Sequence, residues 1–81
     1  MERERLQFQG RLAEKELSAK KLELKAEGLR DVIRLHIDPF AKIEEIDVEV
    51  AFQAMTELVD ATLEYREILG EIKAIKKALG R

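Results

Sequence analysis

The chain has 81 residues and contains neither cysteine nor tryptophan, with a single proline and a single histidine. The lack of cysteine excludes disulfides, thiolate nucleophiles and cysteine-ligated zinc or iron–sulfur sites. Because secreted domains of this size usually depend on disulfides, we expect a protein of a reducing compartment, the cytoplasm. The first residues contain no apolar signal-peptide core, and no apolar run approaches membrane-spanning length. We therefore expect no membrane association.

Glycine and aromatic residues are also scarce, with four glycines and an aromatic content of 5%. Large sheets and cofactor pockets usually draw on more aromatic and β-branched side chains than this. The content of hydrophobic residues, 46%, is too high for a disordered tail, and 40% of the residues are charged. This balance is typical of long amphipathic helices. We expect one all-α domain over residues 1–81.

The charge is unevenly distributed along the chain, although the net charge is only −2. Residues 1–37 carry nine basic and seven acidic side chains, a net charge of +2. Residues 38–69 carry a net charge of −7, and residues 70–81 a net charge of +3. The small overall charge argues against a general affinity for nucleic acid, so we expect no nucleic-acid partner.

A first helix is predicted over about residues 3–37. Apolar and small residues alternate there by three and four positions, the spacing of a seam that packs against another helix. Gly10 and Gly28 each cost about 1 kcal/mol in a helix relative to alanine. The predicted seam of this helix contains Phe8, Leu12, Ala19, Leu22, Ala26, Leu29, Ile33 and His36.

A second helix is predicted over about residues 48–79. Asp47 is a suitable N-cap, and Gly80 follows a basic last turn, as glycine often does at the end of a helix. A neighbouring column of Ala54, Ala61, Ile68 and Ile75 lies beside the seam. The predicted seam itself contains Val48, Ala51, Met55, Leu58, Thr62, Tyr65, Leu69, Ile72, Lys76 and Leu79.

The connector over about residues 38–47 is predicted to reverse the chain. Pro39 disfavours the helical region for Asp38, which ends the first helix. A short helical turn follows, and Phe40, Ile43 and Ile46 are spaced to seal the open end of a bundle. Folding back near residue 42 places residue i opposite residue 84 − i, which brings many opposite charges together. This favours an antiparallel two-helix hairpin, coiled-coil-like, over one continuous rod.

The apolar face of the second helix is wider than one partner helix can cover, and a long exposed apolar patch usually marks an interface. We therefore expect self-association, most simply a homodimer that completes a four-helix bundle. Another helical protein is the alternative partner. The predicted interface residues are Leu22, Leu29, Ile33, Ala51, Phe52, Met55, Leu58, Val59, Tyr65, Ile68, Leu69, Ile72 and Ile75.

His36 and the acidic connector are the two places where chemistry is conceivable. A general acid or base needs a positioned partner and a pocket, and His36 falls in the helix seam instead. A structural role or a pH-sensitive contact fits it better. The connector carboxylates lack the alternation and glycine of a calcium loop, and no Glu-x-x-His pair of a di-iron bundle is present. We expect no catalytic residue, metal or cofactor.

The sequence favours a non-catalytic oligomerisation or protein–protein interaction module, an adaptor or scaffold. Two alternatives stay open. A nucleic-acid-associated or regulatory accessory protein would use the basic end of the bundle, and would be retained on heparin in a salt-dependent way. A compact helical enzyme would hold its site at a dimer interface, and would show a polar pocket there.

Overall fold

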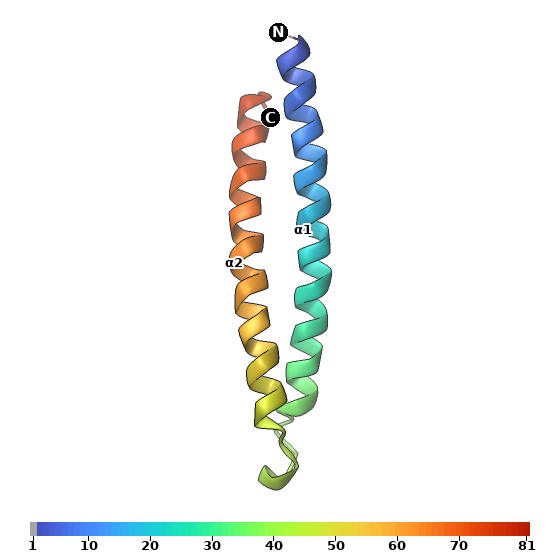
Figure 1. The fold of residues 1–81 in the computed structure, drawn as a ribbon, viewed down its shortest axis with the longest axis vertical. Helices are drawn as coiled ribbons and strands as arrows, with labels where there is room; N and C mark the ends of the chain where they lie inside the picture. The colour runs from blue at the N-terminus through green and yellow to red at the C-terminus, as the bar shows by residue number, and fades with distance from the viewer. Residues whose placement is uncertain (1) are drawn as a thin grey trace.

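The computed structural model describes residues 2–81. Of these residues 86% are helical, and none of them forms a strand. Helix α1 spans Glu2–His36, a 3₁₀ helix η1 spans Ile43–Glu45, and α2 spans Val48–Ala78. The two long helices lie side by side in opposite directions, so both chain ends meet at one end of the molecule (Figure 1). The predicted hairpin is confirmed, and each helix boundary lies within one residue of its prediction.

The ends of α2 follow from local chemistry. The Asp47 carboxylate accepts the backbone N–H of Val50 (N–Oδ1 3.1 Å), which confirms it as the N-cap. At the other end, Gly80 has φ +77°, a value that L side chains rarely adopt. The amide of Arg81 donates to the carbonyl of Lys76 (2.8 Å) and that of Gly80 to Lys77 (3.1 Å). This pair of bonds is the Schellman motif, in which glycine ends a helix.

The connector continues the long axis of the molecule beyond the start of α2 (Figure 1). Asp38 accepts the backbone N–H of Phe40 (N–Oδ1 2.9 Å), and η1 provides the predicted short helical turn. Within the hairpin, the predicted seal of apolar residues at this end does not form. Phe40 is 94% exposed and Ile43 85% exposed, because the turn points away from both helices; only Ile46 is half-buried.

The inner face of α1 is the predicted seam. Every third or fourth residue of this helix is buried or half-buried against α2, and the polar Lys15 lies in the same row. The buried or half-buried seam residues of α1 are Phe8, Leu12, Lys15, Ala19, Leu22, Ala26, Leu29, Ile33 and His36.

The inner face of α2 differs from the predicted seam by one column of residues. Met55, Leu69 and Lys76 of the predicted seam are exposed, and the neighbouring column of Ala54, Ala61, Ile68 and Ile75 takes their place. This column is apolar along its whole length, whereas the replaced column ends in Lys76. It also begins with alanines, which let the helices approach closely near the connector. The buried or half-buried residues of α2 and its C-cap are Ala51, Ala54, Leu58, Ala61, Thr62, Tyr65, Ile68, Glu71, Ile72, Ile75 and Leu79.

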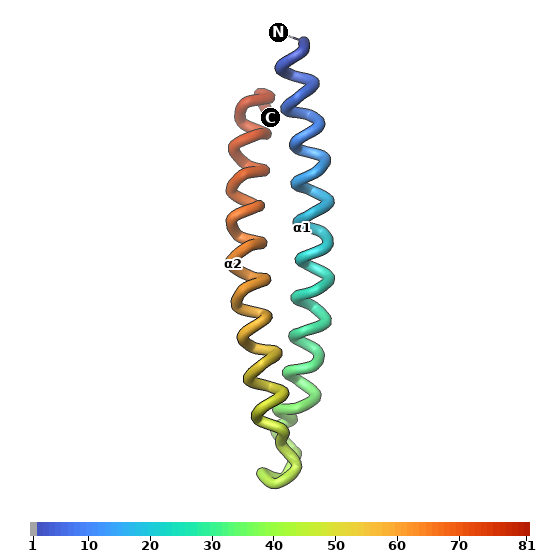
Figure 2. Tube along the Cα trace, viewed as in Figure 1, coloured from blue at the N-terminus to red at the C-terminus, as the bar shows by residue number. Residues whose placement is uncertain are grey.

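The core is thin because each helix has one intramolecular neighbour. Figure 2 shows α1 and α2 running side by side and converging toward the connector. No side chain of the described residues is less than 2% exposed. The largest buried cluster lies toward the end where the termini meet and contains Leu12, Ala19, Ile68, Ile72 and Leu79.

One ion pair joins the two helices and shows their register. The Lys15 ammonium lies 2.6 Å from Oε2 of Glu71, an oxygen that is buried. Residue i therefore lies opposite residue 86 − i, close to the predicted 84 − i. Within residues 2–81 the opposite charges that the predicted fold brings together form no other ion pair between the helices; the other two ion pairs, Lys20–Glu23 and Arg30–Asp31, lie within α1.

Glu71→Gln is expected to lower the stability of the hairpin slightly, in a pH-dependent way. The hydrogen bond to Glu71 and its negative charge raise the pKa of Lys15 above the ordinary 10.5. A raised pKa in the folded state stabilises the fold below pH 10.5, and this contribution is lost as the pH rises through the folded value.

The measurement is denaturant unfolding of both proteins from neutral to alkaline pH. The stability difference should be constant near neutrality and shrink above pH 10.5. Glu23→Gln is the control, since Glu23 pairs with Lys20 within one helix at 3.9 Å. A difference that persists at the highest pH at which the wild type stays folded would contradict this account.

Candidate protein-binding surface

His36, the single histidine, is the last residue of α1 and lies half-buried at the connector end of the seam. Asp38, the carboxylate nearest to it in sequence, accepts the amide of Phe40 and so stabilises the turn. This geometry gives the imidazole a place in the packing between the helices. A pH-sensitive role for His36 stays a prediction.

The acidic residues of the connector are used for local backbone structure. Asp38, Glu45 and Asp47 each accept a backbone N–H, from Phe40, Lys42 and Val50 respectively. Within residues 2–81, no three side chains of the metal-binding types gather into a group that could hold an ion. The connector carboxylates thus form caps and turns that expose negative charge at this end of the molecule.

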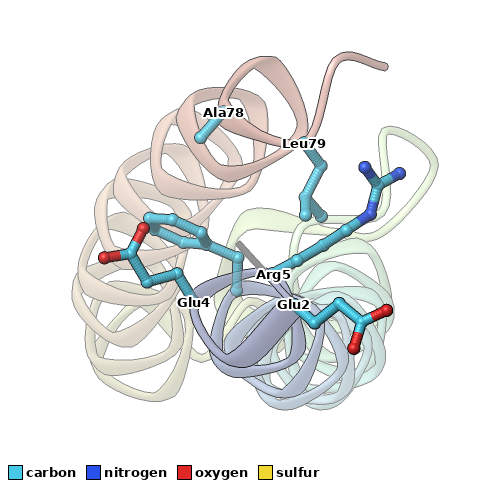
Figure 3. A pocket seen from close by; sticks show the side chains of 6 residues that line it. Glu2, Glu4, Arg5, Ala78 and Leu79 are labelled. Carbon is cyan, nitrogen blue, oxygen red and sulfur yellow. The ribbon is translucent and has the colours of Figure 1, made fainter.

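The hollow between the two chain ends is open and carries mixed charge. Its volume is about 350 Å³, and Figure 3 shows Glu4 on one side of it and Glu2 and Arg5 on the other. The side chains of α2 at this place are Ala78 and Leu79, which offer no polar group. Because carboxylates and a guanidinium surround this hollow together, it favours neither an anionic nor a cationic ligand.

A continuous apolar surface runs along the first half of α2, away from α1. We call it the outer stripe, and its members recur every three or four residues, so they share one side of the helix. Phe52 is 76% exposed, and each of the others is about half exposed or more. A shallow hollow of about 260 Å³ lies over Met55, Val59 and Leu63. The outer stripe consists of Val48, Phe52, Met55, Val59 and Leu63.

A second apolar row lies on α1, on the side opposite to α2. Leu6, Leu17, Leu24 and Leu35 are each more than half exposed. Their separations of eleven, seven and eleven residues are close to whole numbers of helical turns, so the four lie in one line. On this side of α1 the two gaps contain Gly10, Ala13, Gly28 and Asp31, so the row is interrupted by small and charged residues where the outer stripe is continuous.

The thirteen predicted interface residues divide into two groups. Nine of them are buried or half-buried between α1 and α2, so the hairpin itself covers them. Phe52, Met55, Val59 and Leu69 stay exposed. The predicted interface omitted Val48 and Leu63 of the outer stripe and the row on α1. A plot of residue positions around each helix axis could have found both, because they follow helical spacing.

The last turns of α2 and Arg81, beyond its end, form a basic surface. Lys73, Lys76, Lys77 and Arg81 surround a hollow of about 480 Å³ whose apolar side is Leu69 and Ile72.

In the part of the chain that the structure describes, no helix has the length and apolar character needed to cross a membrane. Comparisons with protein-family models, with curated proteins and with solved structures give no match.

Proposed function

We propose that this chain is a non-catalytic protein–protein interaction module that assembles with itself, as a dimer, through the outer stripe of α2. Two coiled-coil-like hairpins would then complete a four-helix bundle. The proposal includes a cytoplasmic location, which rests on the cysteine-free composition.

The excess of exposed surface carries this proposal. The hairpin exposes 6740 Å², whereas a compact monomer of its mass, 9.4 kDa, exposes about 5,000 Å². Its radius of gyration is 18.1 Å, against about 12 Å for a compact chain of this length. A standard interface covers about 800 Å² of each partner. The excess of about 1,700 Å² is therefore enough for a full interface.

The outer stripe is the better interface of the two exposed apolar surfaces. Its five side chains follow one another without a gap of more than four residues, which lets a second helix pack along it. The α1 row leaves two gaps without a large apolar side chain, where a partner helix would meet Gly10, Ala13 and Gly28 and would bury the carboxylate of Asp31. Dimerisation through α2 covers the continuous surface and leaves the interrupted one in solvent.

Light scattering behind size exclusion, across a concentration series, tests this proposal, with circular dichroism on the same fractions. A strongly helical dimer is expected, because the thin core leaves an isolated hairpin only marginally stable. A helical monomer at every concentration would contradict self-association. The stripe would then be free for another helical protein, and capture of a helical partner would be the following step.

The basic surface at the end of α2 supports a second candidate, a nucleic-acid-associated accessory protein. Four basic side chains around one hollow could contact phosphates. Glu71, in the same turns, pairs with Lys15 and lowers the net positive charge there. Salt-dependent retention on heparin by the wild type, lost in Lys76→Gln/Lys77→Gln, would favour this function. Elution at low salt would exclude it.

A further inference from the structure

We infer that the two hairpins pair through α2 in antiparallel orientation, with the twofold axis close to Met55. This inference rests on the proposed self-association and adds its geometry. In this arrangement Val48 of one copy lies opposite Leu63 of the other, and Phe52 lies opposite Val59. The basic second half of α2 then lies along the acidic connector of the other copy.

The outer stripe changes character halfway along α2. Phe52, Val59, Arg66 and Lys73 are separated by seven residues each, so they form one column along the helix. The first two are apolar and the last two are basic. The apolar half is centred near Met55, so two copies bury this half fully only when their stripes overlap around that residue.

Charge decides between the two orientations that such an overlap allows. In a parallel pair, Arg66 and Lys73 of one copy lie beside Arg66 and Lys73 of the other. The two acidic connectors also lie side by side. In an antiparallel pair, the half of α2 that carries Arg66 and Lys73 extends past the stripe of the other copy toward Glu44 and Glu45. Like charges in register repel and opposite charges attract, so only the antiparallel pair is complementary along its whole length.

The exposed apolar residues of the connector support the same orientation. Phe40 and Ile43 are almost fully exposed in the hairpin, beyond the start of α2. Antiparallel pairing brings the second half of the other copy's α2 to this place. Leu69, itself 43% exposed, belongs to that segment and offers an apolar surface. A parallel pair would leave Phe40 and Ile43 next to the other connector, beyond the ends of both α2 helices.

Disulfide mapping tests this geometry in a full-length chain that has no cysteine of its own. Three single variants are prepared, Val48→Cys, Met55→Cys and Leu63→Cys, and are oxidised alone and in pairs. Residues 48 and 63 are about 22 Å apart along a helix, at 1.5 Å per residue. A disulfide requires Cα atoms within about 7 Å of each other. Antiparallel and parallel dimers therefore form different disulfide-linked products.

The antiparallel pair predicts rapid disulfides within the Met55→Cys variant and between Val48→Cys and Leu63→Cys when these are mixed. Val48→Cys alone should stay largely reduced. Disulfides of Val48→Cys with itself would overturn the antiparallel orientation. A dimer in which Met55→Cys fails to cross-link would show that α2 is not the interface. In both cases the self-association would stand, whereas a monomer by light scattering would contradict the proposed function itself.

A charge exchange provides an independent check. Arg66→Glu should weaken dimerisation about threefold to tenfold, because each exposed ion pair contributes little and the dimer contains two of them. Adding Glu44→Lys to the same chain should restore it in an antiparallel dimer. Glu44 is preferred over Glu45, whose carboxylate already accepts the amide of Lys42. Further weakening by the second substitution would contradict the inference.

Discussion

Ile68→Asp is expected to unfold the hairpin and abolish its assembly together. Ile68 is 8% exposed and lies in the main buried cluster with Leu12, Ala19, Ile72 and Leu79. The substitution removes a buried side chain and places an unpaired carboxylate in the core, at a cost of about 3 kcal/mol or more. A core of this size supplies about 3–5 kcal/mol in total. Far-ultraviolet circular dichroism should show a large loss of helix.

The matched control is Leu17→Asp, since Leu17 is 58% exposed on the side of α1 opposite to α2. This variant introduces the same charge in the middle of a long helix without entering the core. It should keep its helix content and its size. A folded Ile68→Asp variant of normal size would show that the buried cluster does not hold the hairpin together.

Phe52→Glu is expected to separate the dimer into helical monomers. Phe52 is 76% exposed in the hairpin and has no role between α1 and α2. Each copy loses about 2 kcal/mol of apolar burial, so a symmetric dimer loses about 4 kcal/mol. Every 1.4 kcal/mol is a factor of ten in Kd, and the dissociation constant should rise about a thousandfold. Light scattering should report monomer at concentrations where the wild type is dimeric.

Leu24→Glu is the control for this experiment, because Leu24 is 56% exposed and belongs to the interrupted row on α1. It should dimerise as the wild type does. The opposite result, a dimeric Phe52→Glu and a monomeric Leu24→Glu, would move the interface from α2 to α1. Equal behaviour of both variants as dimers would exclude both surfaces.

The results expected for Ile68→Asp and Phe52→Glu depend on which face of α2 packs against α1. The sequence prediction placed that face one column of residues away from its position in the structure. Two neighbouring columns, one of Ala54, Ala61, Ile68 and Ile75 and one of Met55, Thr62, Leu69 and Lys76, both carry apolar residues at helical spacing. Periodicity alone ranks them about equally. Packing against α1 selects the column that stays apolar to its end, and this choice leaves Met55 and Leu69 in solvent. Ile68, predicted as an interface residue, therefore belongs to the hairpin core.

The connector shows the same limit of prediction from sequence. Local chemistry gave the N-cap Asp47 correctly, because its carboxylate acts on a backbone group three residues away. The spacing of Phe40, Ile43 and Ile46 suggested a plug between the helices, yet the direction of the turn depends on the backbone path between α1 and α2. That path carries Phe40 and Ile43 into solvent.

By itself the sequence determined the all-α hairpin, the ends of both helices and the inner face of α1, because these follow from contacts within a few residues and from one unambiguous apolar row. Only the tertiary structure decided the inner face of α2, the Lys15–Glu71 pair and the outward connector. Each of these depends on the rotation and axial position of one helix against the other. Those two quantities are set by side-chain packing across the whole length of the hairpin.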